Sequence, residues 1–175
     1  MKKSGFTLLE LLAVIVVLAV LATLGSRAIR SARIGAKKAQ AMVEMKAIET
    51  AVKAYHAKYG KLPLLDADQG RDMEASEFDE AFSQDTILML TAEDGGLNPA
   101  GIVFLEPQGA STNGVFTDPW GAQYLIYLDA NYDNEVVVEH EAVTATLRRR
   151  VALLSVGLYE SAGNQATNDV VTSWE

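Results

Sequence analysis

Residues 5–24 of the chain read GFTLLELLAVIVVLAVLATL. From Phe6 to Leu24 every residue is apolar or small except Thr7, Glu10 and Thr23. An apolar helix of about 20 residues is long enough to cross the hydrocarbon core of a bilayer. The sequence therefore predicts a transmembrane helix over residues 6–24, with one carboxylate inside it.

Two interpretations of the Glu10 carboxylate are open. Placing it in hydrocarbon costs about 2.5 kcal/mol or more, and an acid within a membrane segment usually marks a functional site. Alternatively, Glu10 lies near the end of the segment and reaches the headgroups, or it is protonated. The flanking sequence favours a functional role, because Lys2, Lys3 and a small Ser-Gly pair directly precede the apolar run. An ordinary secretory signal has its cleavage site after the apolar core.

The stretch KKSGFTLLELLAVI at residues 2–15 resembles the leader and cleavage site of type IV prepilins. Type IV pilins and the pseudopilins of type II secretion share this motif. The resemblance implies that a prepilin peptidase removes residues 1–5 as a leader by cutting between Gly5 and Phe6. It also implies that the peptidase methylates the new N-terminal amine of Phe6.

The resemblance gives Glu10 a hypothetical role in assembly. A free amine on Phe6 and a carboxylate on Glu10 are both costly in hydrocarbon, and each offsets part of the cost of burying the other. We therefore expect Glu10 to pair with Phe6 of the next subunit and to set the axial register of a helical filament.

Charge is divided unevenly along the chain. Residues 1–38 hold seven Lys or Arg and one acid, whereas residues 39–175 hold eight Lys or Arg and 22 acids. The acidic part argues against nonspecific nucleic-acid binding, which needs clustered basic residues. Counting basic residues on either side of the span would keep this part cytoplasmic. The resemblance instead implies a single-pass protein of the inner (cytoplasmic) membrane with its head in the periplasm, and then a periplasmic filament. We follow the resemblance.

The segment after the apolar run continues as a helix. Apolar residues recur at helical spacing on one face, which is expected to pack on a sheet. Gly60 and Pro63 are expected to end the helix, and Gly25 is the expected place for a bend. The members of the apolar face are Ala41, Met45, Ile48, Val52, Tyr55 and Tyr59.

The rest of the chain predicts a globular head. A helix is expected to end at Ala92, with Ser76 and Asp79 as its capping signal. Turn residues then separate apolar runs of strand character. The expected strands are 102–105, 123–128, 136–138 and 149–156. The fold class is therefore α+β: a long N-terminal helix, membrane-spanning in its first half, packed on a C-terminal antiparallel sheet. The expected divisions are a leader 1–5, a membrane half 6–24, an amphipathic half 25–60 and a head 61–175.

Two further stretches resemble the major pseudopilins of type II secretion. They are DPWGAQY at residues 118–124 and SVG at residues 155–157 with the polar loop that follows. By its residues alone, the first stretch is a tight turn that delivers an aromatic side chain to the core. The resemblance implies a calcium ion in the C-terminal loop. Glu160 and Asp169 are the acids of that loop and the expected ligands.

Other candidate sites are weaker. Asp129, Asn131 and Asp133 have the spacing of the first half of an EF-hand, but the later positions fail, so a hairpin turn is expected. His140 and His56 lack the partners of a zinc or catalytic site. The triple Arg at residues 148–150 is expected to protect a strand edge, with salt bridges between subunits as the alternative. The sequence contains no cysteine, which excludes disulfides.

The sequence therefore favours a structural, non-enzymatic protein, a subunit of a type II secretion pseudopilus. Alternatives are a type IV pilin for adhesion, motility or DNA uptake, and a membrane-anchored binding domain. The expected partners are copies of the chain itself, prepilin peptidase, the inner-membrane assembly platform, minor pseudopilins and the lipid bilayer. No nucleic acid is expected to bind the acidic head.

Overall fold

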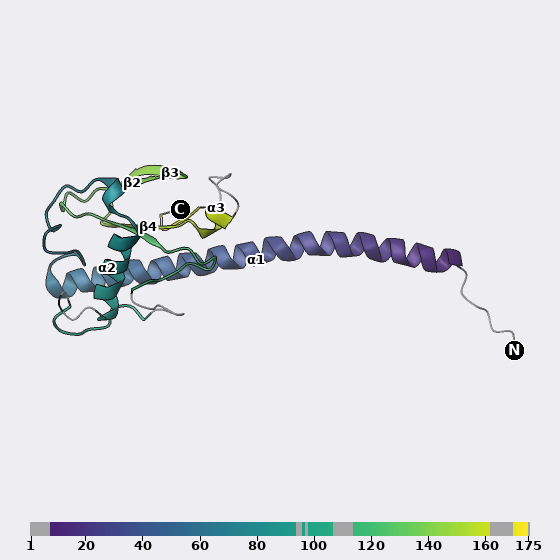
Figure 1. The fold of residues 1–175 in the computed structure, drawn as a ribbon, viewed down its shortest axis with the longest axis horizontal. Helices are drawn as coiled ribbons and strands as arrows, with labels where there is room; N and C mark the ends of the chain where they lie inside the picture. Colours follow the sequence, from purple (N-terminus) through teal and green to yellow (C-terminus); the bar gives the residue numbers. More distant parts are fainter. Residues whose placement is uncertain (1–7, 94–95, 97, 107–113, 162–169, 175) are drawn as a thin grey trace. The chain divides into compact units, whose positions relative to one another are not determined.

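The structure, a computed structural model, describes residues 8–93, 96, 98–106, 114–161 and 170–174, with the backbone alone for residues 22–28, 160 and 161. The chain divides into two compact units, residues 1–37 and residues 38–175. A long N-terminal helix precedes an antiparallel sheet, so the predicted α+β class is confirmed (Figure 1).

The first element is the helix α1, Leu8–Tyr59, of 52 residues. Its backbone is helical at residues 25 and 26, where the sequence suggested a bend. The helix ends where predicted, because Gly60 adopts a left-handed φ of 71° and its N–H donates to the carbonyl of His56. Glycine takes this conformation without the steric cost that a Cβ would add.

The C-terminal part of α1 forms the floor of the head's core. Met45, Ile48, Val52 and Tyr55 are fully buried, and one hydrophobic cluster joins them to the strands. The predicted apolar face is therefore confirmed. Tyr59, at its end, is half-buried and donates a hydrogen bond of 2.6 Å to the Asn98 side chain.

Two antiparallel sheets make up the strand part of the head. The first sheet has the order β1-β4-β5, with β1 at Leu125–Leu128, β4 at Val151–Ser155 and β5 at Val171–Thr172. The second sheet pairs β2, Val136–His140, with β3, Val143–Leu147. In the central strand β4 every side chain is buried. The predicted strands over 123–128, 136–138 and 149–156 are confirmed in position, whereas β3 and β5 were not predicted.

The predicted strand over residues 102–105 is wrong. The N–H groups of Phe104 and Leu105 both donate to the carbonyl of Leu90, at 2.8 and 3.0 Å. Leu90 lies in the last turn of the helix α2, Glu80–Thr91. Carbonyls in the last turn of a helix have no partner within the helix. The N–H groups of this segment therefore donate to the carbonyl at the end of a helix rather than to a neighbouring strand.

The start of α2 also differs from the prediction. Asp79 is the N-cap, and its side chain accepts a hydrogen bond of 2.8 Å from the N–H of Phe82. Ser76 instead lies within the short 3₁₀ helix η1, Ala75–Glu77. A single residue, rather than the pair of Ser76 and Asp79, therefore caps the helix.

Asp118 joins the turn before β1 to the end of β4. The residue is buried, with 4% of its surface exposed. Oδ1 accepts from the N–H groups of Trp120 and Ala122, at 2.9 and 3.0 Å. Oδ2 accepts from the Ser155 hydroxyl at 2.6 Å and from the Gly157 N–H at 2.9 Å. The predicted tight turn is confirmed, and the two stretches singled out in the sequence meet at one buried carboxylate.

Gly157 is required by this contact. A Cβ at residue 157 would lie 2.6 Å from both carboxylate oxygens of Asp118. A side chain there would have to displace the carboxylate.

Replacing Asp118 by Ala should destabilise the head, because two partly buried N–H groups, one buried N–H group and one buried hydroxyl lose their acceptor. Each buried donor left without a partner costs about 1–3 kcal/mol before water or rearrangement relieves it. We expect Asp118→Ala to lower the free energy of unfolding by roughly 3 kcal/mol. Urea unfolding of the detergent-solubilised chain, followed by tryptophan fluorescence, measures this change.

The matched control is Asp66→Ala, which removes an exposed carboxylate that pairs only with Lys61 among the described residues. An exposed ion pair contributes about 0–1 kcal/mol. Equal destabilisation by the two substitutions would contradict the role assigned to Asp118.

Candidate functional site

The first part of α1 is apolar on all sides and exposed. Its large apolar side chains between Leu8 and Leu21 are 49 to 88% exposed. A helix that is apolar all round is normally buried, in a protein core or a membrane. An apolar patch of this kind marks a surface that lipid or another protein covers. These side chains are Leu8, Leu9, Leu11, Leu12, Val14, Ile15, Val16, Val17, Leu18, Val20 and Leu21.

Glu10 lies on this part of α1, in the first turn that the structure describes, and its side chain is exposed. It is the only charged residue between residues 4 and 26. Gly5 and Phe6, the predicted cleavage and methylation positions, lie outside the described residues. The register role of Glu10 therefore stays a prediction.

No helix in the part of the chain that the structure describes is long and apolar enough to cross a membrane.

The described part of the chain does not include the side chains of the two predicted calcium ligands. Glu160 lies on the short helix α3, Gly157–Ser161, and its side chain is not described. Asp169 lies outside the described residues. Within residues 8–93, 96, 98–106, 114–161 and 170–174, no three His, Asp or Glu side chains form a group that could hold a metal. The calcium prediction stays a prediction.

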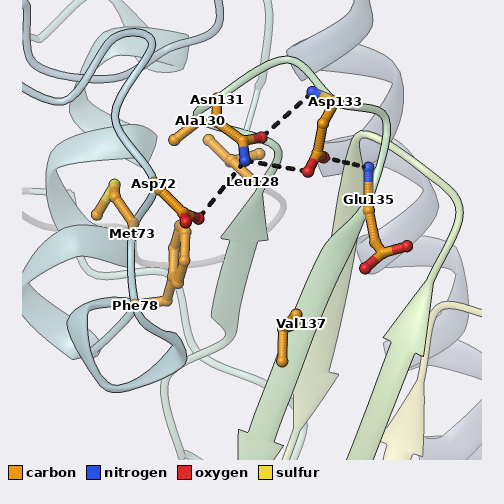
Figure 2. Close-up of a pocket in the computed structure, with 9 residues that line it drawn as sticks. All are labelled: Asp72, Met73, Phe78, Leu128, Ala130, Asn131, Asp133, Glu135 and Val137. Carbon is orange, nitrogen blue, oxygen red and sulfur yellow. Dashed lines mark hydrogen bonds between the residues drawn. The ribbon is translucent and has the colours of Figure 1, made fainter.

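The EF-hand-like loop after β1 borders a cleft of about 260 Å³. Figure 2 shows the Asn131 amide directed towards Asp72 and Asp133, at 3.5 and 3.0 Å. Other polar atoms of the loop bond to its own backbone, since Asp133 accepts from the N–H of Glu135 and Asn131 accepts from the N–H of Asp133. These bonds hold the loop in a turn.

Asp129 closes the same turn. It is 1% exposed, its Oδ2 accepts from the N–H of Asn134 at 3.0 Å, and burial raises the pKa of its carboxyl. The predicted turn is confirmed, but it is not a hairpin. It joins β1 to β2, and these two strands belong to different sheets.

The two histidines contact neighbouring groups of the fold. Nδ1 of His140 accepts a hydrogen bond of 3.2 Å from the N–H of Ala142 in the β2–β3 turn. Nε2 of His56 lies 3.3 Å from Nη1 of Arg150. Neither contact includes a carboxylate or a hydroxyl nucleophile, so neither resembles a catalytic pair.

One long-range contact was missed by the sequence analysis. The Tyr124 hydroxyl, which is buried before β1, donates to the Glu44 carboxylate on α1 at 2.5 Å. Burial, followed by the bond to Glu44, raises the pKa of Tyr124. The two residues are 80 positions apart, and no local pattern relates them.

The comparison with protein families supports the N-terminal prediction. Residues 1–26 match the family model described as the prokaryotic N-terminal methylation motif. No curated protein and no solved structure matches the chain. The type IV prepilin leader is thus confirmed, and it implies processing by prepilin peptidase and pilus-type assembly. The motif points to a structural subunit rather than an enzyme. The finer likeness to the major pseudopilins stays a prediction.

Proposed function

We propose that the chain is a structural subunit of a type II secretion pseudopilus. It polymerises through α1, and the growing filament drives protein export. One observation carries the proposal: the helix that follows the methylation motif exposes apolar side chains on all sides from Leu8 to Leu21. Such a helix needs a continuous apolar cover, which a bilayer supplies before assembly and other copies of the helix supply afterwards.

The size of the apolar surface makes the cover obligatory. Fully burying one exposed Val, Leu or Ile side chain is worth about 1.5–3 kcal/mol. Together, the exposed side chains of this segment disfavour a free monomer in water by an energy at least comparable to the free energy that usually stabilises a small domain, about 5–15 kcal/mol. The precursor accordingly resides in the inner membrane, with its head in the periplasm.

Apolar burial alone does not explain why the helix leaves the bilayer. Lipid tails are as apolar as leucine, so transfer from lipid to a helical bundle gains nothing from the hydrophobic effect. The carboxylate of Glu10 supplies a difference between the two environments. It is costly in lipid, and it gains a partner if the amine of Phe6 from the next subunit lies beside it.

Two features favour a pseudopilus over a pilus for adhesion, motility or DNA uptake. The stretch at residues 118–124 resembles that of the major pseudopilins, and its Asp118 organises the head. The chain also has no cysteine, whereas many type IV pilins close a C-terminal loop with a disulfide. The partners in this function are prepilin peptidase, the inner-membrane assembly platform and minor pseudopilins.

Processing fixes the mass and chemistry of the N-terminus. When the chain is produced together with a prepilin peptidase, the membrane-extracted protein should begin with N-methyl-Phe6. Mass spectrometry of the intact protein and of its N-terminal peptide measures this. Substituting Gly5→Leu should leave the leader attached. A wild-type chain that still begins at Met1 or Lys2 would rule out the processing step.

Glu10→Leu should abolish assembly while leaving the head folded, because the change removes the partner of the Phe6 amine. In a strain without the chromosomal gene, the wild-type chain should restore secretion of the exported proteins, and Glu10→Leu should leave them in the periplasm. Filaments sheared from cells that overproduce the chain should decrease at least tenfold in the variant.

The control is Glu141→Leu, an equivalent loss of an exposed acid on the head, which should behave as wild type. Normal filament yield and register with Glu10→Leu would refute the register role. If loss of the gene instead abolished surface fibres and left secretion intact, the protein would be a pilin.

A further inference from the structure

Two recesses lie on opposite flanks of α1 in the head. One, of about 310 Å³, is lined on the helix by Glu49, Lys53 and His56. The other, of about 860 Å³, is lined on the helix by Ala39, Gln40, Val43, Glu44 and Ala47. At 3.6 residues per turn the two sets are centred roughly 140° apart around the helix. The buried face of α1 lies between the two sets on one side, and its exposed face lies between them on the other.

The first recess, which we call the basic pocket, is completed by Leu62, Asn134, Arg149, Arg150 and Val151. Glu49 is its only acid, and both oxygens of that carboxylate are taken, by Lys46 at 2.8 Å and Lys53 at 2.5 Å. Burial acts to raise the pKa of Glu49, but the bonds from the two lysines outweigh it and lower the pKa. Glu49 therefore does not neutralise the arginines.

Arg150 contacts another nitrogen group at its tip, and it also interacts electrostatically with the buried carboxyl of Asp129. Its Nη1 lies 3.3 Å from Nε2 of His56, and a guanidinium can only donate, so the imidazole accepts. Among the described residues no carboxylate lies within ion-pair distance of Arg149 or Arg150. Residues 39–175 carry 22 acids against eight Lys or Arg, so this concentration of positive charge is local.

The second recess, which we call the acidic groove, has an apolar floor and an acidic rim. Leu105 and Phe116 form the floor at 3 and 5% exposure, and Val43 on the helix is 70% exposed. Glu44 is held by Tyr124 and Gln40. Glu106 is exposed on the rim, directly after Leu105, whose N–H is fixed to the carbonyl of Leu90. In the part of the chain that the structure describes, Glu106 takes part in no ion pair.

We propose that the two recesses meet between neighbouring copies of the chain, with Arg150 of one copy bound to Glu106 of the next. In this arrangement, the rim of the acidic groove on one copy occupies the basic pocket of its neighbour. This inference rests on the proposed function, which places the α1 helices of neighbouring subunits side by side.

Charge and position together select this partner. Two different patches on opposite flanks of one element form a heterologous contact, which propagates as an open filament when the rotation between subunits does not close. Arginine and carboxylate can form two parallel hydrogen bonds, which fixes the orientation of the heads. A pair near the surface contributes more to specificity and register than to affinity. The contact therefore complements Glu10, setting the rotation of the heads while Glu10 sets the axial position of the helices.

The absence of cysteine from the sequence allows a direct test. Two variants of the full-length chain, Arg150→Cys and Glu106→Cys, are produced together in cells that assemble filaments, and a short bis-maleimide is added. We expect a cross-linked dimer that contains one copy of each variant. The dimer should be absent when either variant is produced alone, and when Glu106→Cys is combined with Arg148→Cys. It should also be lost when both chains carry Glu10→Leu.

Charge reversal provides the second measurement. Arg150→Glu and Glu106→Arg should each reduce the yield of sheared filaments several-fold, and the double variant should restore it to within twofold of wild type. Arg148→Glu, the same charge change two residues away, should leave the filament yield unchanged. Combining Arg148→Glu with Glu106→Arg should not raise the yield above that of Glu106→Arg alone.

The outcomes separate this inference from the proposed function. If wild-type filaments form but neither the mixed cross-link nor the rescue is seen, the contact between Arg150 and Glu106 is wrong and the filament function stands. If the processed wild-type chain forms no filament at all, both proposals are overturned. Circular dichroism of the solubilised protein detects a charge variant that fails to fold. In that case the cross-link between Arg150→Cys and Glu106→Cys tests the contact.

Discussion

The apolar surface that encircles α1 from Leu8 to Leu21 is the constraint on which the behaviour of this protein depends. These side chains stay exposed in the single chain. Water solvates such a surface poorly, so the segment needs an apolar cover, which in the proposed function is lipid or other copies of itself. In the proposed function, its one charged residue, Glu10, would distinguish lipid from an assembly of subunits, because the next subunit would place the amine of Phe6 beside it. In the proposed function, membrane storage and filament growth both depend on this one helix.

The same helix serves the head in a different way. Beyond residue 38 it buries one face, from Ala41 to Tyr55, under the strands, and its opposite face stays open. Buried polar contacts fix the head on this floor. Asp118 holds the turn before β1 to the end of β4, and Tyr124 ties that region to Glu44 on α1. The two recesses that flank the open face therefore have a defined position relative to the helix.

Features with a local cause could be predicted from the sequence. The apolar period of α1, its glycine stop at Gly60 and the tight turn at residues 118–121 all depend on neighbours in the chain, and all were predicted. The segment at 102–105 has strand composition, but its N–H groups donate to the carbonyl of Leu90, which lies in the last turn of α2. That competition depends on packing and has no sequence pattern. The bonds from Ser155 and Gly157 to Asp118 and the Tyr124–Glu44 bond are long-range, so no local pattern predicts them, although the two stretches that Asp118 joins were each noticed separately.

The most direct test of the central claim is the structure of the assembled particle by electron cryomicroscopy of the processed, full-length chain. The account predicts a helical filament in which residues 8–21 of each copy lie near the axis, surrounded by the same segment of other copies, with the heads outside. A filament held together by the heads alone, with these residues outside its core, would contradict it. So would a processed chain that stays monomeric in its membrane.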